Sequence, residues 1–340
     1  QGIDGALLSH DRQEYFAAVD ENHAGEWSTI TGVRLAPPDA RQAELQLVVA
    51  SAPGATVRWS GIEWSLPEAD AKREITVASV YLRPRSPSTP ASNIEQFCGM
   101  IDAAGQAGAD LCVLPEAITV VGVPGAKPAD VAEAIPGPIS EKLGHHAQQS
   151  GMYVVACYPE RHGPDVYNTA ILLDRNGRLV GKYRKTHLPN EEVDAGYTAG
   201  DSYPVFRCDF GMVGLMICWD VAFPEPARAL AIAGAEILLM PIWGGNETLM
   251  SARAIENAVY VVSSSYGSPT GVIDPLGAWQ AVVRPEDEGI DAGEGHLVLA
   301  TIDLADRKRW DWVGDFSQRW QIERRGDIPM EIPAQASIGR

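Results

Sequence analysis

Apolar and polar positions divide this chain into two differently patterned parts that meet near residue 72. Before that point, polar and apolar residues alternate, as in 44–49, and a period of two predicts half-exposed antiparallel strands. The alternation of Val57 and Trp59 with Ile62 and Trp64 slips at Ser60-Gly61, which predicts a β-bulge. After residue 72, short continuous apolar runs predict strands that are buried on both faces.

The second part alternates predicted strands with predicted helices. The predicted strands are 75–80, 111–114, 153–156, 169–173, 213–217, 237–240 and 259–263. Helical patterns cover 139–149, 225–233 and 248–258. Asn93 with Gln96 three residues later predicts another helix start, and Asn176-Gly177 predicts a hairpin turn before a strand that ends at Lys185. The mixture predicts an α/β fold of two packed sheets with helices outside.

Length and composition are those of a globular protein with more than one part. The chain has 340 residues, of which 45% are hydrophobic and 21% charged, and we expect two domains, 1–72 and 73–340. No run approaches about 18 consecutive apolar residues, so no transmembrane helix is expected. A net charge of −18 argues against nucleic acids and anionic membranes as partners. We expect a cytoplasmic protein, or an exported one if Gln1 follows a removed signal peptide.

The cysteine and histidine positions predict no metal site. The five cysteines, Cys98, Cys112, Cys157, Cys208 and Cys218, show no C-x-x-C spacing, so neither a zinc site nor a redox dithiol is expected. The first three lie in apolar patterns and are predicted to be core residues. His145-His146 has no evident carboxylate or cysteine partner in register, which favours a solvated helix face over a metal site.

Cys218 is the strongest candidate for chemistry. It ends the apolar run 213–217, and Pro224 and Pro226 suit the first turn of a helix. The cysteine is therefore predicted to lie on a tight strand-to-helix turn near backbone N–H groups, which would hold the thiol rigidly and lower its pKa. The alternative interpretation is a buried core cysteine.

An acid and a lysine also follow predicted strands. Glu116 comes two residues after the run 111–114, and Lys185 ends the strand that follows the hairpin. A carboxylate can take the proton of a thiol, and a lysine can stabilise the oxyanion that forms when a carbonyl or nitrile carbon is attacked. Together with Cys218, these residues form a complete set for nucleophilic catalysis.

Three motifs resemble those of the nitrilase (carbon–nitrogen hydrolase) superfamily, in the family's order. They are Leu-Pro-Glu at 114–116, Lys-Tyr-Arg-Lys-Thr-His-Leu-Pro at 182–189 and Gly-Leu-Met-Ile-Cys-Trp-Asp at 214–220. The likeness runs from about residue 74 to about residue 320. It implies a four-layer α-β-β-α sandwich, a homodimer or larger homo-oligomer, and chemistry that needs no cofactor.

The resemblance also implies residue roles. Glu116 would be the general base, Lys185 the oxyanion-stabilising lysine and Cys218 the nucleophile. A second glutamate of the family fits Glu192 best, although the adjacent Glu191 stays open, and so does a solvated loop carboxylate.

Further residues near these motifs have two interpretations each. The backbone N–H of Trp219 would be a second oxyanion donor. Trp243 follows the predicted strand 237–240 and either lines the pocket or packs in the core. His187 lies two residues after Lys185, and we expect it to form structural hydrogen bonds.

The expected function is that of a cysteine-dependent amidohydrolase acting on a small linear carboxamide through a thioester. Asp220 after Trp219 resembles the amidase and carbamoylase branches. An N-carbamoyl hydrolase, a nitrile hydrolase and an amide acyltransferase remain alternatives with the same triad. A non-catalytic carbohydrate-binding protein is the alternative of another class.

The N-terminal part resembles half of a galactose-binding-like β-sandwich module. About 70 residues with few strands are marginal alone, so we expect this part to depend on another domain or subunit. Trp27, Trp59 and Trp64 either bind a sugar weakly or close a small core. The module is expected to contribute no catalytic residue, and the aromatic stretch 310–316 would be an exposed patch on a monomer.

Overall fold

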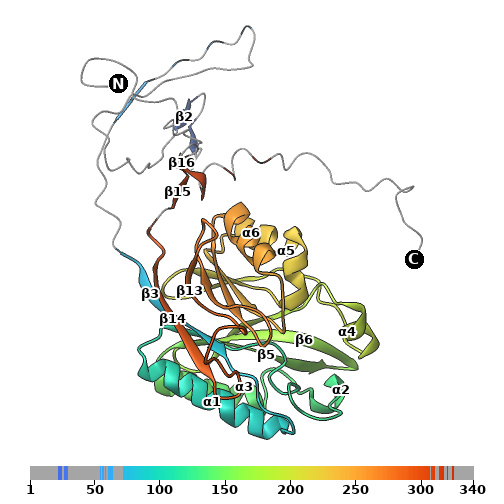
Figure 1. Cartoon of the computed structure of the whole chain (residues 1–340). Coiled ribbons are helices and arrows are strands. Elements are labelled where there is room, and N and C mark those ends of the chain that lie inside the picture. Colours follow the sequence, from blue (N-terminus) through green and yellow to red (C-terminus); the bar gives the residue numbers. More distant parts are fainter. Residues whose placement is uncertain are drawn as a thin grey trace. The chain divides into compact units, whose positions relative to one another are not determined.

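A computed structural model describes residues 72–306 and 308, together with short stretches at 22–24, 27–29, 54, 56, 58, 60–63, 309–310, 314–317, 320 and 324. The chain divides into two compact units. One is Lys72–Lys308, and the other combines Gln1–Ala71 with Arg309–Arg340 (Figure 1).

The large unit contains two six-stranded mixed sheets. The first has the order β14 (His296–Asp303), β3 (Glu74–Tyr81), β4 (Leu111–Val113), β5 (Tyr153–His162), β6 (Asp165–Leu173) and β7 (Leu179–Arg184). The second has the order β13 (Trp279–Val283), β12 (Thr270–Ile273), β11 (Tyr260–Ser264), β10 (Ile237–Pro241), β9 (Met212–Leu215) and β8 (Val205–Arg207).

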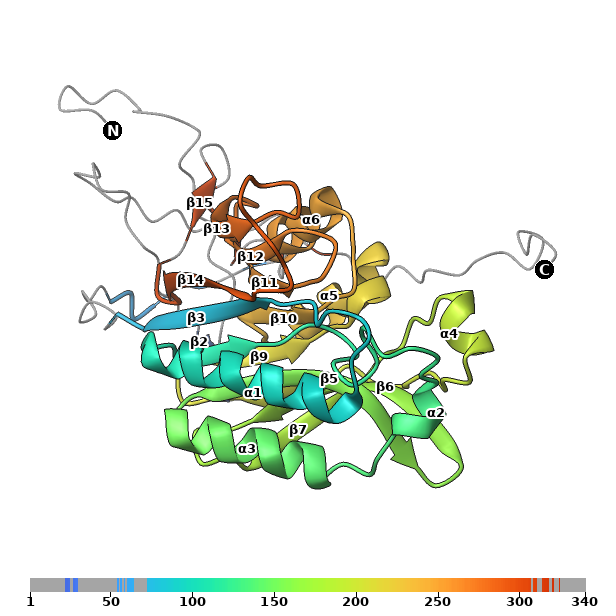
Figure 2. The same ribbon diagram turned by 60° about the horizontal axis from the view of Figure 1, so that its bottom comes forward.

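Helices cover the outer faces of both sheets. Figure 2 shows α1 (Pro90–Gln106) and α3 (Pro138–Ser150) below one sheet, and α5 (Pro224–Ile232) and α6 (Glu247–Asn257) above the other. Shorter segments are α2 (Pro128–Val131), α4 (Asn190–Asp194) and a 3₁₀ helix at Cys218–Ala222. The predicted four-layer α-β-β-α sandwich is confirmed.

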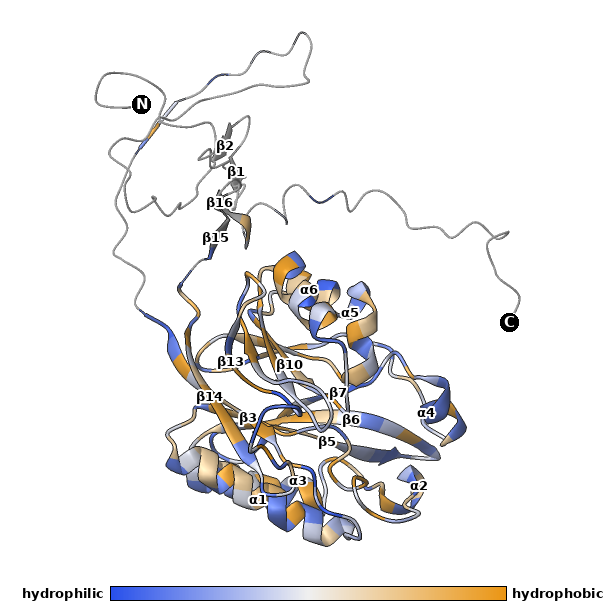
Figure 3. Cartoon of the chain, in the orientation of Figure 1, coloured by the Kyte–Doolittle hydropathy of each residue, from blue (hydrophilic) through white to orange (hydrophobic). Residues whose placement is uncertain are grey.

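The apolar runs form two cores because both faces of the central strands are buried. In β4, Leu111 and Val113 pack between the two sheets, whereas Cys112 points to the layer of α1 and α3. Successive side chains of a strand point to opposite faces, so a strand between two apolar layers needs apolar residues at every position. Figure 3 shows hydrophobic positions along the central strands and mostly hydrophilic positions on α4.

The parallel strands bring their carboxyl ends together. β3, β4 and β5 are mutually parallel in one sheet, as are β9, β10 and β11 in the other. The two sheets meet at this edge, since the hydroxyl of Ser79 donates to the carbonyl of Ser263 and that of Ser264 to the carbonyl of Val80. Loops at the carboxyl ends of parallel strands are a common place for ligand sites.

Most predicted elements of the large unit are confirmed, within a few residues at their ends, except that β5 continues to His162 beyond the predicted 153–156. The helix start predicted at Asn93 is wrong, because α1 begins at Pro90 and its N-cap is Thr89. Asn93 is instead buried, and its amide donates to the carbonyls of Ile118 and Val121. Strands β8, β12, β13 and β14 were not predicted.

In the second unit, β1 (Asn22–Ala24) pairs antiparallel with β2 (Trp27–Thr29), and β15 (Arg309–Trp310) with β16 (Gly314–Asp315). Residues 60–63 form no strand, so the bulged strand predicted there is wrong at these positions. The predicted strand 44–49 lies outside the described residues, as do Trp59 and Trp64. The side chain of Trp27 and most of the aromatic stretch 310–316 lie outside them as well.

Candidate active site

Lys185 lies at the centre of a buried polar cluster. It follows β7 directly, its side chain is 0% exposed, and its Nζ lies 2.9 Å from Glu116 Oε1 and 2.5 Å from Glu192 Oε1. Burial by itself lowers the pKa of a lysine, but the negative charges of Glu116 and Glu192, with that of Cys218 once it is ionised, outweigh it and raise the pKa. The lysine is therefore an ammonium ion at neutral pH.

Glu116 is held in one orientation by four donors. Its Oε1 accepts from Lys185 and from Asn168 Nδ2 at 2.8 Å, and its Oε2 accepts from the backbone N–H of Trp243 at 2.9 Å. The hydroxyl of Tyr266 donates to its backbone carbonyl at 2.8 Å. The residue is 2% exposed, so this carboxylate is fixed in a nearly dry environment.

Cys218 begins the 3₁₀ helix on the tight turn that the sequence predicted. Its Sγ lies 3.7 Å from the carbonyl oxygen of Gly244. The prediction of a lowered thiol pKa is wrong, because burial and the negative charge of Glu116 raise the pKa to about 12 against the opposing effect of Lys185. The Cys218 side chain is therefore a neutral thiol beside a carboxylate.

Two non-glycine residues at this edge have left-handed backbone conformations. Cys218 has φ 44°, and Ala117, directly after Glu116, has φ 52°. Such conformations cost about 1–2 kcal/mol in a residue with a side chain and are concentrated at functional sites. One of these strained residues is the candidate nucleophile Cys218 itself, and the other directly follows the candidate base Glu116.

Asp220 joins the turn of Cys218 to the segment after Lys185. Its carboxylate is completely buried and accepts from the backbone N–H of Ile217 at 2.9 Å and the hydroxyl of Tyr183 at 2.7 Å. It also accepts from the backbone N–H of His187 at 3.1 Å. These contacts fix the cysteine turn relative to the lysine strand.

Of the two candidate second glutamates, only Glu192 reaches the cluster. It lies on the short helix α4, where the sequence predicted a loop, while Glu191 on the same helix is exposed. The pKa of Glu192 is raised. Burial is the largest cause, and the negative charge of Glu116 adds to it, while the ammonium of Lys185 acts in the opposite direction.

Aromatic residues lie on the segments that carry the candidate site. Trp219 and Trp243 are 46% and 39% exposed, and the Trp243 ring packs edge-on against that of Tyr266. His187 has the structural hydrogen bonds that the sequence predicted, with Nδ1 3.1 Å from Asp220 Oδ1, and its ring stacks on Phe223.

Asn168 is a site residue that the sequence analysis missed. Its amide donates to Glu116 and lies 3.4 Å from Glu192 Oε2, while its carbonyl oxygen accepts from the thiol of Cys157. The residue is 2% exposed. The signal available in the sequence was the polar pair Asn168-Thr169 directly before the apolar end of strand β6.

The remaining cysteines are buried as predicted, at Cys98, Cys112 and Cys157, and Cys208 is buried too. The interpretation of His145-His146 needs correction, because His146 Nδ1 lies 2.7 Å from the Asp102 carboxylate of α1. Helix packing supplied this partner, which is distant in sequence.

A second polar cluster stabilises the strand that leads to Lys185. Glu160 of β5 is 1% exposed and pairs with Lys182 at 2.5 Å and Arg184 at 2.7 Å, both on β7. Burial alone would raise the pKa of Glu160, but hydrogen bonds from Arg184, Lys182 and Thr169 lower it to about 2.

We expect Glu160→Gln to lower the free energy of unfolding by about 2 to 3 kcal/mol at pH 7, discounted for the partial exposure of both cations. The native pKa lies below that of the unfolded chain, so the carboxylate stabilises the fold above about pH 4.5 and loses this effect as the pH falls towards 2. Urea unfolding at pH 7 and pH 3 should show a smaller difference between parent and variant at pH 3. A difference that does not change with pH would contradict this interpretation.

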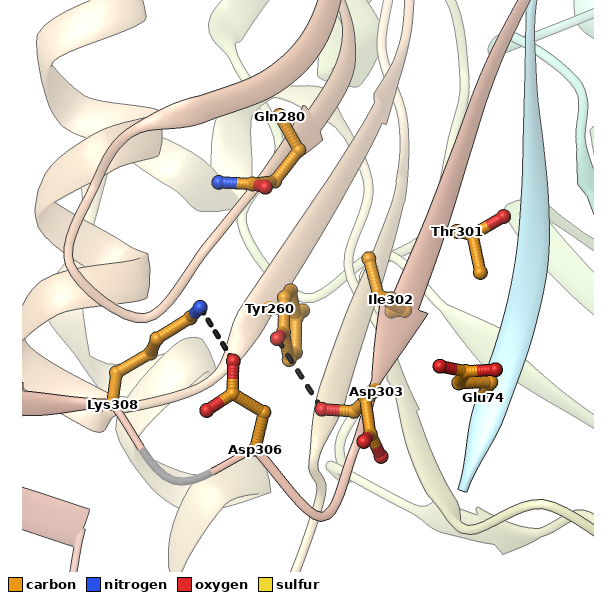
Figure 4. Close-up of a pocket in the computed structure, with 8 residues that line it drawn as sticks. All are labelled: Glu74, Tyr260, Gln280, Thr301, Ile302, Asp303, Asp306 and Lys308. Carbon is orange, nitrogen blue, oxygen red and sulfur yellow. Dashed lines mark hydrogen bonds and ion pairs between the residues drawn. The ribbon is translucent and has the colours of Figure 1, made fainter. Parts of the chain in front are cut away.

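A different hollow lies at the opposite edge of the sheets. It measures about 180 Å³ and is lined by residues at the amino end of β3 and the carboxyl end of β14, including Glu74 and Asp303 (Figure 4). The Lys308 ammonium lies 2.7 Å from Asp306 in its wall. None of its lining residues is a cysteine or histidine, so this hollow lacks a thiol or imidazole for nucleophilic catalysis.

Within the described residues, no group of three or more His, Cys, Asp or Glu side chains is arranged to hold a metal ion. No described helix combines the length and apolar character that crossing a bilayer requires.

Residues 76–311 match the family model of carbon–nitrogen hydrolases. The chain belongs to the carbon–nitrogen hydrolase family. Members of this nitrilase superfamily with amidase activity are among its relatives, and the chain is a hydrolase of carbon–nitrogen bonds other than peptide bonds.

Curated relatives include the omega-amidase NIT2 of Bos taurus, 32% identical over 238 residues that cover 64% of this chain and 85% of the relative. The deaminated glutathione amidase of Mus musculus is 30% identical over 290 residues, covering 76% and 84%. An amidase structure from Nesterenkonia AN1 shares the fold, with a TM-score of 0.60 and 23% identity over 74% of this chain and 95% of that one.

Proposed function

We propose that this carbon–nitrogen hydrolase cleaves small linear carboxamides with Cys218 as nucleophile, through a thioester. The observation that carries the proposal is the buried Lys185 ammonium between Glu116 and Glu192, next to a thiol on a strained turn. Burying three ionisable groups is costly, and such perturbed clusters are concentrated at catalytic sites.

In the first half-reaction, Cys218 Sγ attacks the amide carbon while Glu116 takes the thiol proton. The raised pKa of the thiol makes this base necessary, because little thiolate exists before substrate binds. Lys185 and the backbone N–H of Trp219 stabilise the oxyanion, since an N–H in the first turn of a helix has no acceptor within that helix. Glu116 then passes its proton to the nitrogen, the C–N bond breaks and the amine leaves.

In the second half-reaction, Glu116 takes a proton from water, which attacks the thioester. The oxyanion forms again beside Lys185, the C–S bond breaks and the proton returns to the thiol as the acid is released. Glu192 keeps Lys185 charged and in place, and Asn168 fixes the direction of the Glu116 carboxylate. No step requires a group beyond these residues and water.

We propose a carboxamide, rather than a nitrile or a carbamoyl compound, as the substrate. The reason is that the relatives include an omega-amidase and a deaminated glutathione amidase. The same residues would serve N-carbamoyl hydrolysis, nitrile hydrolysis or acyl transfer. Non-catalytic sugar binding would leave the buried Glu116, Lys185 and Cys218 cluster without a role.

A panel of small amides, carbamoyl compounds and nitriles tests the proposal. We expect ammonia and the free acid in equal amounts from at least one linear amide, faster than from the matching nitrile or carbamoyl compound. The Cys218→Ala variant is the control for background hydrolysis. Turnover of nitriles alone, or release of ammonia only when an amine acceptor is present, would replace the proposed reaction by one of the alternatives.

A further inference from the structure

Glu116 and the aromatic residue Tyr266 come from different sheets and meet at the Cys218 edge. Glu116 follows β4 by three residues, and Tyr266 follows β11 by two. Tyr266 is 3% exposed, and its hydroxyl donates to the backbone carbonyl of Glu116 at 2.8 Å. The two residues are 150 positions apart in the sequence, so this contact exists only because the two sheets pack together.

The hydroxyl of Tyr266 binds the backbone at a strained position. The carbonyl that it binds belongs to the peptide between Glu116 and Ala117, and Ala117 has φ 52°. A left-handed conformation is unfavourable for alanine unless surrounding contacts hold it. Burial raises the pKa of Tyr266 well above that of an exposed phenol, so the hydroxyl keeps its proton and stays a donor. The direction in which the Glu116 side chain leaves the backbone therefore depends in part on this hydrogen bond.

The ring of Tyr266 acts on Glu116 from a second side, through Trp243. The two rings pack edge-on with centroids 5.2 Å apart, and the backbone N–H of Tyr266 donates to the carbonyl of Trp243 at 3.4 Å. The backbone N–H of Trp243 donates in turn to Glu116 Oε2 at 2.9 Å. Gly244, the next residue, accepts from the Cys218 thiol. Tyr266 thus contacts both the backbone of the base and the segment that binds its carboxylate.

The loop that carries Tyr266 is itself fixed by side-chain hydrogen bonds. Ser265 Oγ accepts from the backbone N–H of Ser268 at 3.1 Å, and the backbone N–H of Ser265 donates to Thr270 Oγ1 at 3.0 Å. All three residues are buried. A buried loop whose polar groups are paired holds its side chains in a narrow range of positions. Tyr266 therefore projects from a rigid support.

We infer that Tyr266 is a positioning residue for Glu116, whose hydroxyl and ring keep the carboxylate of the base directed at the Cys218 thiol. It acts through Glu116 and Trp243 and takes no proton itself. The inference rests on the proposed amidase mechanism, in which Glu116 takes the thiol proton and later activates water. General-base catalysis requires hydrogen-bond contact between the base and the proton it takes, so a small displacement of Glu116 lowers kcat.

The test compares Tyr266→Phe with the parent enzyme on the linear amide that the substrate panel shows to be hydrolysed fastest. The variant keeps the ring against Trp243 and loses only the hydroxyl, so the fold should persist. We expect kcat to fall by about 5- to 20-fold while KM changes by less than about twofold, because the base loses alignment and the substrate contacts stay. Tyr266→Leu also removes the ring, and its kcat should fall further.

Tyr260→Phe is the matched control. Tyr260 begins the same strand β11, is 6% exposed, and its hydroxyl donates to the backbone carbonyl of Asp303 at 3.4 Å, at the opposite edge of the sheets. Because distant sites act independently, this variant should keep kcat and KM within about twofold of the parent. A kcat loss in Tyr260→Phe as large as that in Tyr266→Phe, or an unchanged kcat in Tyr266→Phe, would overturn the inference while leaving amidase function intact.

Hydrogen–deuterium exchange of backbone amides tests the positioning without any substrate. We expect the Trp243 amide, which donates to Glu116, to exchange about fivefold or more faster in Tyr266→Phe, while the amides of β10 and β11 keep their parent rates. Faster exchange throughout both strands would indicate a general loss of stability and would contradict the inference. If the parent hydrolyses no amide but the Trp243 amide still depends on Tyr266, the proposed function fails and the positioning contact stands. If neither hydrolysis nor this dependence occurs, both are wrong.

Discussion

Replacing Cys218 with alanine should reduce amide hydrolysis by about 10⁴-fold or more, as removal of a catalytic nucleophile does in other hydrolases. The loss follows because the thiol that would carry the acyl group is removed, whereas Cys157, another thiol near Glu116, is fully buried. Alanine also lacks only the sulfur atom at a residue with φ 44°, so the fold should persist. Initial rates of ammonia release and a thermal unfolding curve measure the two effects.

Rapid quenching of the parent enzyme during turnover should give an acyl adduct on Cys218 by mass spectrometry. The matched control is Cys98→Ala, which removes a buried thiol from α1, well outside the polar cluster, and should retain activity. An adduct on Cys98, Cys112, Cys157 or Cys208, or activity within a few-fold of the parent in a folded Cys218→Ala protein, would disprove the mechanism.

Replacing Lys185 with alanine should damage both activity and stability. Loss of one oxyanion donor lowers kcat by about 100- to 1000-fold. Breaking a buried ion pair costs about 3 to 5 kcal/mol of unfolding free energy, because Glu116 and Glu192 lose their shared cation.

The stability loss in Lys185→Ala should depend on pH with a definite sign. The native pKa of Glu192 is already raised in the parent, and removal of the ammonium, which lowers it, raises it further above that of the unfolded chain. Such groups favour folding when protonated, so the variant should lose stability as the pH rises from about 4.5. Denaturant unfolding at several pH values measures this.

A double variant distinguishes the loss of an oxyanion donor from a loss of activity caused by misfolding. Lys185→Met with Glu192→Gln removes one charge of each sign and should recover part of the stability, but no activity. Recovery of activity in the double variant, or a single variant whose stability loss is the same at pH 5 and pH 8, would contradict the roles given to this cluster.

Sequence patterns were sufficient to predict the strands and turns that carry the candidate site. Their burial and turn preferences depend on residues that are neighbours in the sequence. The run 213–217 is apolar because both faces of β9 are buried, and the following prolines define the helix α5. Three strand-end motifs therefore located Glu116, Lys185 and Cys218 before any contact was known. The start of α1 was missed because Ser92 and Thr89, rather than Asn93, make its capping contacts.

The pKa of Cys218 shows where a local interpretation fails. A turn with backbone N–H groups predicts a lowered thiol pKa, but Glu116 comes from the other sheet and burial comes from several elements. Both effects are long-range in sequence and act against the local one. The choice between Glu191 and Glu192 has the same origin, since it depends on which face of α4 meets Lys185.

The sequence by itself determined the strands, the turns and the motifs at their ends, because strand burial and turn formation depend on residues that are neighbours in the chain. The tertiary structure decided which groups share a proton, a charge or a hydrogen bond. Asn168, Asp220 and Tyr266 acquire their contacts from segments tens of residues away, through the pairing of β6 with β7 and the meeting of the two sheets. Electrostatic and hydrogen-bond energies depend on distance and burial, which only the folded chain defines.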